Sequence, residues 1–184
     1  LYEQNLTDRL RILGPDHPDT LTSRNNLAGA HQAAGRLDQA IPLYEQNLTD
    51  RLRILGPDHP STLTSRNNLA YAHQAAGRLD QAIPLYEQTL TDSLRILGPD
   101  HPNTLTSRNN LAYAHQAAGH LDQAIALHEQ NLTDSLRILG PDHPSTKIFR
   151  NNLASAYQAA GRSEDVTALF DPPPDSGAAD ADRP

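Results

Sequence analysis

The sequence predicts an all-α protein, a right-handed α-solenoid built from antiparallel helix hairpins. Asn-Asn-Leu-Ala recurs with a period of 42 residues, at 25–28, 67–70, 109–112 and 151–154. Each unit also contains two stretches with apolar residues at helical spacing, separated by a glycine. A fixed period of this length is typical of stacked repeats that bury their apolar faces against their neighbours.

The first helix of a unit is expected to follow the recurring sequence Gly-Pro-Asp-His-Pro. In the first complete unit Asp16 or His17 would cap a helix over about 18–34, with Pro18 in its first turn, where a missing N–H costs nothing. At 100° per residue, one side of this helix carries Leu21, Arg24, Leu27, Ala28 and His31, which we expect to face the core.

The second helix is expected to begin at Leu37, after the short link at Gly35, and to run to about Leu55. Pro42 near its start removes one hydrogen bond, so that residue should face outward. The short link makes the two helices antiparallel. The apolar stripe of the second helix comprises Leu37, Ala40, Ile41, Tyr44, Leu48, Leu52 and Leu55.

These units divide the chain into a repeat array over 1–170 and a tail over 171–184. The array starts with an unpaired helix over 1–13 and continues with hairpins at about 18–55, 60–97, 102–139 and 144–170. The tail is rich in Pro, Asp and Ala and is expected to be disordered. The start in mid-repeat at Leu1, without Met, suggests a fragment or an incomplete gene model.

Composition narrows the function. The 184 residues contain no cysteine, which excludes a disulfide framework and a thiolate metal site. The net charge is −7 and no face can gather a dominant cluster of Lys and Arg, which argues against nucleic-acid binding. No apolar run approaches the roughly 18 residues of a membrane span, and no signal peptide is evident. A cytoplasmic protein is therefore expected.

The pattern of large and small residues resembles the tetratricopeptide repeat, as shown by Leu69, Ala70, His73, Gly77, Ala82 and Tyr86. The period of 42 residues, Asn-Asn-Leu-Ala and Leu-Gly-Pro-Asp-His-Pro resemble the kinesin light chain subtype. The near-identical units are similar to those of actinobacterial proteins, in which such arrays often follow a signalling NTPase module. The resemblance covers residues 1–170 and implies a protein-binding superhelix whose first helices line a concave face.

Two features depart from the family pattern. His31, His73 and His115 replace the usual Tyr, which returns at Tyr157. An arginine recurs at a core-facing position that is usually apolar, and it needs a partner there. Folding each hairpin back about its glycine predicts the pairs Arg24–Glu45, Arg66–Glu87, Arg108–Glu129 and Arg150–Asp171.

No catalytic residue, metal site or cofactor is expected. His17, His59, His101 and His143 each follow an Asp in a loop, where loop structure beside a helix-capping Asp explains them more simply than metal binding does. A titrating ladder of His31, His73 and His115 is a weaker alternative to ordinary core packing. Every Ser, His, Asp and Glu of interest recurs from unit to unit, as scaffold positions do, whereas an active site needs a unique constellation.

The candidate binding site is the concave groove. Side-chain amides both donate and accept, so rows of them can hold the backbone of an extended peptide. For the row that begins with Asn25, groove contact and bonding between helices are equal alternatives; for the neighbouring row of Asn68, bonding between helices is favoured. The predicted peptide-binding residues are Asn25, Asn67, Tyr71, Gln74, Asn109, Tyr113, Gln116 and Asn151.

One groove position varies between units, as Gly29, Tyr71, Tyr113 and Ser155. The Tyr pair could hold apolar side chains of a ligand, and drift after duplication is the alternative. Replacing both Tyr residues is expected to leave stability little changed, because they face solvent.

The function expected is a scaffold that binds a protein or an extended peptide, as the sensor part of a larger bacterial signalling protein. The alternative is a structural module that associates end to end through its terminal helices, since 1–13 would expose an apolar stripe.

Overall fold

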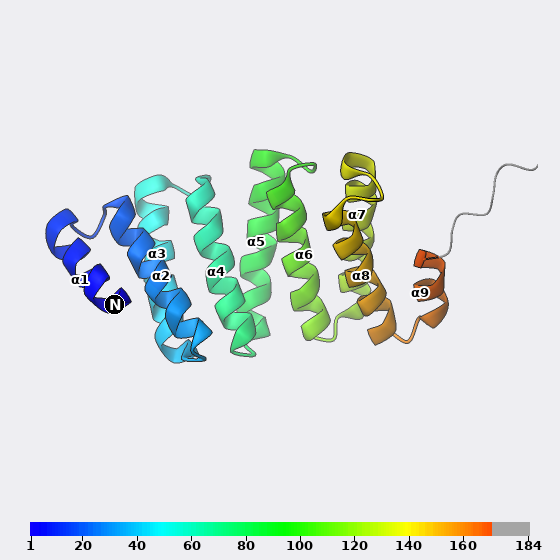
Figure 1. Ribbon diagram of the computed structural model, residues 1–184, viewed down its shortest axis with the longest axis horizontal. Helices are drawn as coiled ribbons and strands as arrows, with labels where there is room; N and C mark the ends of the chain where they lie inside the picture. Colours follow the sequence, from blue (N-terminus) through cyan, green and yellow to red (C-terminus); the bar gives the residue numbers. More distant parts are fainter. Residues whose placement is uncertain (171–184) are drawn as a thin grey trace, which may run out of the picture.

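The computed structural model describes residues 1–170, which form an all-α, right-handed solenoid of consecutive hairpins (Figure 1). No described residue lies in a strand. The expected disorder of 171–184 lies outside the described residues. The helices are α1 (Tyr2–Leu13), α2 (Pro18–Ala33), α3 (Leu37–Leu55), α4 (Pro60–Ala75), α5 (Leu79–Leu97), α6 (Pro102–Ala117), α7 (Leu121–Leu139), α8 (Pro144–Ala159) and α9 (Ser163–Phe170).

Each helix packs on the next one in the chain, so the core is a series of interfaces between neighbours. One such interface joins the hairpin of α2 and α3 to α4. Its buried residues are Ala28, Ala40, Ile41, Tyr44, Leu48, Leu69 and Ala72. Burying one such Leu, Ile or Tyr side chain contributes roughly 1.5–3 kcal/mol.

The two kinds of turn have local causes. Within a hairpin, Gly35 takes a φ of 71°, and the N–H of Arg36 donates to the carbonyl of His31 at 2.9 Å. This left-handed conformation suits glycine, which has no Cβ to clash. Between hairpins, the Nδ1 atom of His17 accepts from the backbone N–H of Asp19 at 3.2 Å, so the histidine rather than Asp16 caps α2. The corresponding caps are His59, His101 and His143.

The core arginines pair with different carboxylates from those predicted. Arg24 donates to Asp50 at 2.5 Å, Arg66 to Asp92 at 2.7 Å, and Arg108 to Asp134 at 2.9 Å. The predictions of Glu45, Glu87 and Glu129 were therefore wrong, and Arg150–Asp171 involves a residue outside the described part.

The error comes from the direction of the side chains. Helical side chains lean toward the N-terminus of their own helix. In an antiparallel hairpin this lean carries the long guanidinium of Arg66 past Glu87, toward the later residues of α5. Asp92 leans back toward it, and the pair is nearly buried, with side-chain exposures of 2% for Arg66 and 14% for Asp92.

None of the helices in the described part of the chain is both long and apolar enough to cross a membrane.

Candidate functional site

The first helices α2, α4, α6 and α8 lie in one layer, and direct hydrogen bonds join consecutive members of that layer. Asn68 Nδ2 donates to Asn25 Oδ1 at 3.0 Å, which links α4 to α2. The same bond recurs from Asn110 to Asn67 and from Asn152 to Asn109, each at 2.8 Å. These bonds join consecutive first helices along one face of the array. We call these three pairs the Asn ladder.

The Asn ladder shows that residues of both amide rows bond between helices. The row of Asn68, Asn110 and Asn152 bonds between helices, as favoured from the sequence. The row of Asn25, Asn67 and Asn109 gives its oxygens to the same bonds.

The Nδ2 groups of Asn25, Asn67 and Asn109 have no partner in the described residues and are not buried. Asn25 lines a hollow of about 620 Å³, and Asn67 lines another of about 300 Å³ between α4, α5 and α6. The ladder therefore leaves a row of accessible hydrogen-bond donors. Asn151, the last member of the row, is exposed on α8.

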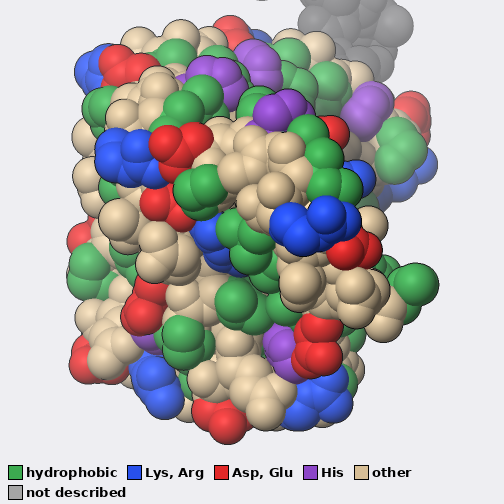
Figure 2. All heavy atoms as spheres, turned by 90° about the vertical axis from the view of Figure 1, so that its left-hand side faces the viewer, with side chains coloured by type: hydrophobic (Ala, Val, Ile, Leu, Met, Phe, Trp, Pro, Cys, Tyr) green, Lys and Arg blue, Asp and Glu red, His purple; other side chains and the backbone are tan. Residues whose placement is uncertain are grey.

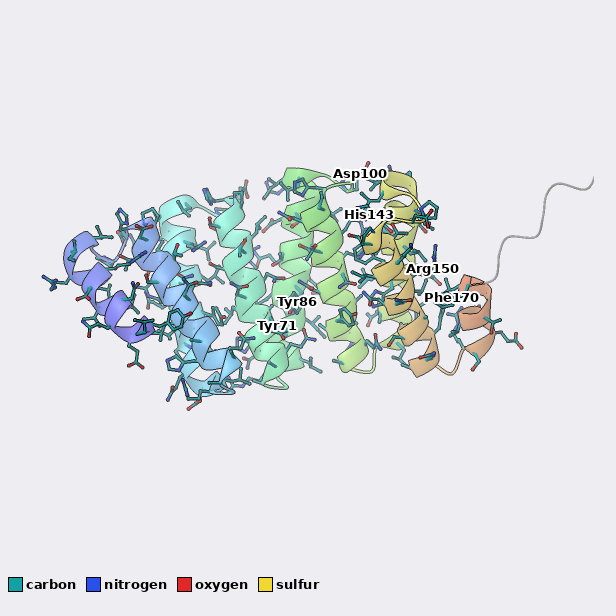
Figure 3. All side chains as sticks on the ribbon, viewed as in Figure 1. Tyr71, Tyr86, Asp100, His143, Arg150 and Phe170 are labelled. Atoms are coloured by element: carbon teal, nitrogen blue, oxygen red, sulfur yellow. The ribbon has the colours of Figure 1, made fainter. Side chains whose placement is uncertain are left out.

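The two groove tyrosines are not equivalent. Tyr71 is 56% exposed and lies close to the buried Tyr86 of α5 (Figure 3). Tyr113 is 39% exposed; its hydroxyl donates to Asn152 Oδ1 at 2.6 Å, and its ring meets the edge of His128 at a centroid distance of 5.5 Å. Tyr113 therefore links α6 to α7 and α8, so its removal is expected to cost stability, unlike the removal of Tyr71.

The remaining predicted site residues are partly engaged with the scaffold. Gln116 Nε2 donates to Ser155 Oγ at 3.4 Å, whereas Gln74 is half-buried. At Gly29 no side chain covers the groove, and a Cβ there would lie 3.5 Å from the hydroxyl of Tyr44, in ordinary contact. Gly29 lines the same hollow as Asn25.

The core histidines are buried, as predicted; two of them make local contacts, whereas His73 Nδ1 has no hydrogen-bond partner among the described residues. His31 Nδ1 accepts from Arg36 Nε at 3.1 Å, and His115 Nδ1 lies 3.3 Å from His120 Nδ1. Burial lowers the pKa of His73 and of His115. Within residues 1–170 no three His, Asp or Glu side chains come together in a way that could hold a metal ion.

His128 is a feature that sequence reasoning missed. It stands where other units have Tyr44 and Tyr86, it is completely buried, and neither ring nitrogen has a hydrogen-bond partner among the described residues. Burial lowers its pKa to about 4. The sequence shows the exchange of Tyr for His at this stripe position of the second helix, and from the sequence alone His128 looks incidental.

Comparison with known proteins agrees with this architecture. The model of the tetratricopeptide repeat family matches residues 1–49, 23–93, 67–133 and 109–171. The crystal structure of kinesin light chain nearly identical TPR-like repeats from Podosopora anserina is 36% identical, with a TM-score of 0.83, and the match covers 92% of this chain and 80% of that one.

Two further relatives extend the comparison. BtubC (BKLC) from P. vanneervenii shares the fold, with a TM-score of 0.79 over 92% of this chain and 67% of that one, at 24% identity. Protein KINESIN LIGHT CHAIN-RELATED 2 from Arabidopsis thaliana is 49% identical over 43 residues, which is 23% of this chain and 6% of that protein. The chain thus spans a small part of the plant relative. The family match over nearly the whole described chain shows that this protein belongs to the tetratricopeptide repeat family, with repeats of the kinesin light chain-like type.

Proposed function

We propose that the chain is a non-enzymatic scaffold that binds an extended peptide along its concave groove. The observation that carries the proposal is the row of accessible donors on Asn25, Asn67 and Asn109, next to the exposed ring of Tyr71. Donors of this kind suit the backbone carbonyls of a peptide, and an exposed aromatic ring suits its side chains.

The groove side of the first helices carries no charged residue within α4 or α6, where Arg66 and Arg108 are buried. Within α4 and α6 the groove therefore has no charged clamp for a phosphate or a carboxylate, and binding there should come from hydrogen bonds and apolar contacts. From the resemblance we further propose a cytoplasmic location and a role as the sensor part of a larger bacterial signalling protein.

Peptide display on the wild-type protein, followed by calorimetric titration of the enriched peptides, tests the groove. Tyr71→Ala should weaken binding about 30-fold if this residue contributes about 2 kcal/mol, as a hot spot does. Leu94→Ala is the matched control, because Leu94 is a 39% exposed apolar residue on the second helix α5, away from the groove. Equal affinities for wild type and Tyr71→Ala would place binding elsewhere.

End-to-end association is a second candidate, and a repeated segment favours it. Residues 1–13 are identical in sequence to residues 43–55. In α3 this segment pairs Asp50 with Arg24 and buries Tyr44, which is 5% exposed. In α1 the equivalent Asp8 and Tyr2 are 48% and 52% exposed.

The uncovered face of α1 is not the expected apolar stripe. Leu6 of that stripe is buried, and Leu10 is as exposed as Leu52 in the interior of the array, at 39% and 38%. Figure 2, which faces the α1 end, shows hydrophobic, acidic and basic side chains interspersed. An association through this end would therefore depend on specific pairs of side chains, above all on an ion pair that involves Asp8.

The opposite end offers the complementary charge. Arg150 of α8 (Figure 3) corresponds in the repeat to Arg24. The residue that corresponds in sequence to Asp50 is Ser176, which carries no charge. Asp8 of a second copy could supply that carboxylate. Lys147 stands at the position of the buried Leu21, and its charge works against such stacking. We therefore rank end-to-end association second, after peptide binding.

A charge exchange tests this candidate by light scattering across a concentration series. Asp8→Arg and Arg150→Asp should each be monomeric alone, and their equimolar mixture should assemble like the wild type, because every junction then regains an opposite pair. A wild-type protein that stays monomeric at all concentrations would reject the candidate.

A further inference from the structure

The hollow of about 300 Å³ between α4, α5 and α6 lies where the sequence repeat is broken. Two buried residues of α5, Thr89 and Ser93, line it, and we call it the Thr89 hollow. Of the second helices α3, α5 and α7, only α5 has a short hydroxyl side chain at both positions. The equivalent residues are Asn47 and Arg51 in α3, and Asn131 and Ser135 in α7.

In the equivalent places of the array, larger side chains fill this space. Asn47 is completely buried and donates to the hydroxyl of Ser65 at 3.3 Å. Beside it, Arg51 Nη1 donates to a backbone carbonyl of α4 at 2.9 Å. Asn131 of α7 is also completely buried. In both neighbouring hairpins a carboxamide therefore stands where α5 has the shorter Thr89.

The hydrogen bonds of Asn131 show what the Thr89 hollow lacks. Asn131 Nδ2 donates to the carbonyl of Leu105 at 2.9 Å, and its Oδ1 accepts from Arg108 at 3.2 Å. The counterpart of Leu105 is Leu63, which lines the hollow. Thr89 makes neither bond, because its hydroxyl donates to a carbonyl of its own helix at 2.7 Å. The carbonyl of Leu63 therefore lacks the amide that its counterpart has.

The other groups in the hollow select an uncharged polar ligand. No Asp, Glu, Lys or Arg lines it. The hydroxyls of Thr64 and Thr106 each donate to a carbonyl of their own helix at 3.0 Å, so their oxygens are left as acceptors. Asn67, whose Nδ2 has no partner in residues 1–170, supplies a donor. A carboxamide both donates and accepts. An ionised group would enter without a counter-charge, and an apolar one would leave these polar groups unpaired.

We propose that the Thr89 hollow binds the carboxamide side chain of a Gln or Asn residue in the peptide that the groove holds. This amide takes the place that Asn47 and Asn131 fill in the neighbouring hairpins. The inference rests on the groove being the binding surface, because Asn67 belongs to both. It adds a side-chain specificity and a fixed register, since the donors of the groove repeat whereas α5 differs from α3 and α7 at this point.

Thr89→Asn tests the proposal by filling the hollow with the residue that the chain itself uses in α3 and α7. Peptides enriched by display on the wild type should share a Gln or Asn at one position. In calorimetric titration of such a peptide, Thr89→Asn should weaken binding at least about tenfold. Thr89→Ser is the control, because it keeps a short hydroxyl and should bind like the wild type. Thermal unfolding followed by circular dichroism verifies that both variants fold.

A change in the peptide tests the same contact without altering the protein. Replacing the shared Gln by Glu, or the shared Asn by Asp, keeps the shape of the side chain and removes its N–H donors. This change should also weaken binding to the wild type at least about tenfold, and it should have little effect on binding to Thr89→Asn, where the amide is already displaced. Equal losses in the two proteins would place the amide outside the hollow and overturn the proposal.

The proposal about the hollow and the proposal about the groove can fail separately. Wild-type display peptides without a shared Gln or Asn, or a Thr89→Asn protein that binds as tightly as the wild type, would overturn the proposal about the hollow. If those peptides still depend on Tyr71, the groove remains the binding surface. Display peptides that are indifferent to Tyr71→Ala would reject the groove itself.

Discussion

Acidification should destabilise the array through His128, and the chain provides its own control. Tyr86 occupies the equivalent position in the preceding hairpin, where it is 1% exposed and lies close to Tyr71. His128→Tyr should therefore fit in the third hairpin. By analogy with Tyr71, the larger ring should push Tyr113 outward and raise its exposure. The perturbation removes a buried titratable ring and leaves the fold intact.

The size of the change in unfolding free energy follows from the pKa of His128. Burial holds the pKa of folded His128 at about 4, whereas an unfolded histidine titrates near 6.5. Between these values the unfolded chain binds more protons, so the contribution to stability is complete above pH 6.5 and is lost as the pH falls toward 4. From pH 7 to pH 4.5 this residue should lower the free energy of unfolding by about 2 kcal/mol.

Urea unfolding at both pH values, followed by far-ultraviolet circular dichroism, measures the effect. His73 and His115 also have lowered pKa values and destabilise the protein in the same direction, so the relevant quantity is the difference between wild type and His128→Tyr. The wild type should lose about 2 kcal/mol more than the variant. The same loss in both proteins would mean that His128 remains solvated or finds a partner, and would refute the reasoning.

Three further predictions concern packing, backbone and binding. Asp92→Ala leaves Arg66 buried without its partner and should lower the free energy of unfolding, measured in urea, by roughly 3 kcal/mol. Glu87→Ala should change it by no more than about 0.5 kcal/mol. A larger loss for Glu87→Ala than for Asp92→Ala would instead support the Arg66–Glu87 pair predicted from the sequence. Gly77→Ala should cost about 1 kcal/mol, because its φ of +71° disfavours a Cβ although no atom stands within 4 Å of it; an unchanged midpoint would contradict this cause. The affinity of a groove peptide should change less than about threefold between about 0.05 and 0.5 M salt, and a steep dependence would reveal a charged clamp.

The fold was predictable because the same signals occur four times. The 42-residue period, the glycine links and the two stripes per unit predicted the hairpins, and helices such as α3 (Leu37–Leu55) begin and end where those signals lie. Such signals are local, since helical spacing and turn chemistry depend on residues a few positions apart. Contacts between helices depend also on how side chains lean. That is why Arg66 was assigned to Glu87 when it pairs with Asp92.

The groove was predictable as a surface but not as a set of atoms. The periodic pattern placed Asn67 and Tyr71 on the exposed side of their helix, and the structure places them there. The sequence could not reveal that Asn110 takes the oxygen of Asn67 and leaves its Nδ2 free, because the bond joins residues 43 positions apart. It also could not separate Tyr71 from Tyr113, whose hydroxyl is bonded to the next unit.

Side-chain amide resonances of the asparagines provide the most direct measurement of the central claim, that the donor row on the concave face holds the ligand. In a ¹⁵N correlation spectrum, with the Asn67 signal assigned by its absence in Asn67→Asp, addition of a display-selected peptide should shift the NH₂ signals of Asn25, Asn67 and Asn109. The signals of Gln46 and Gln88, exposed on α3 and α5, should stay in place. Shifts confined to Gln46 and Gln88, with the Asn67 signal unmoved at saturation, would contradict the claim and move the binding site to the second helices.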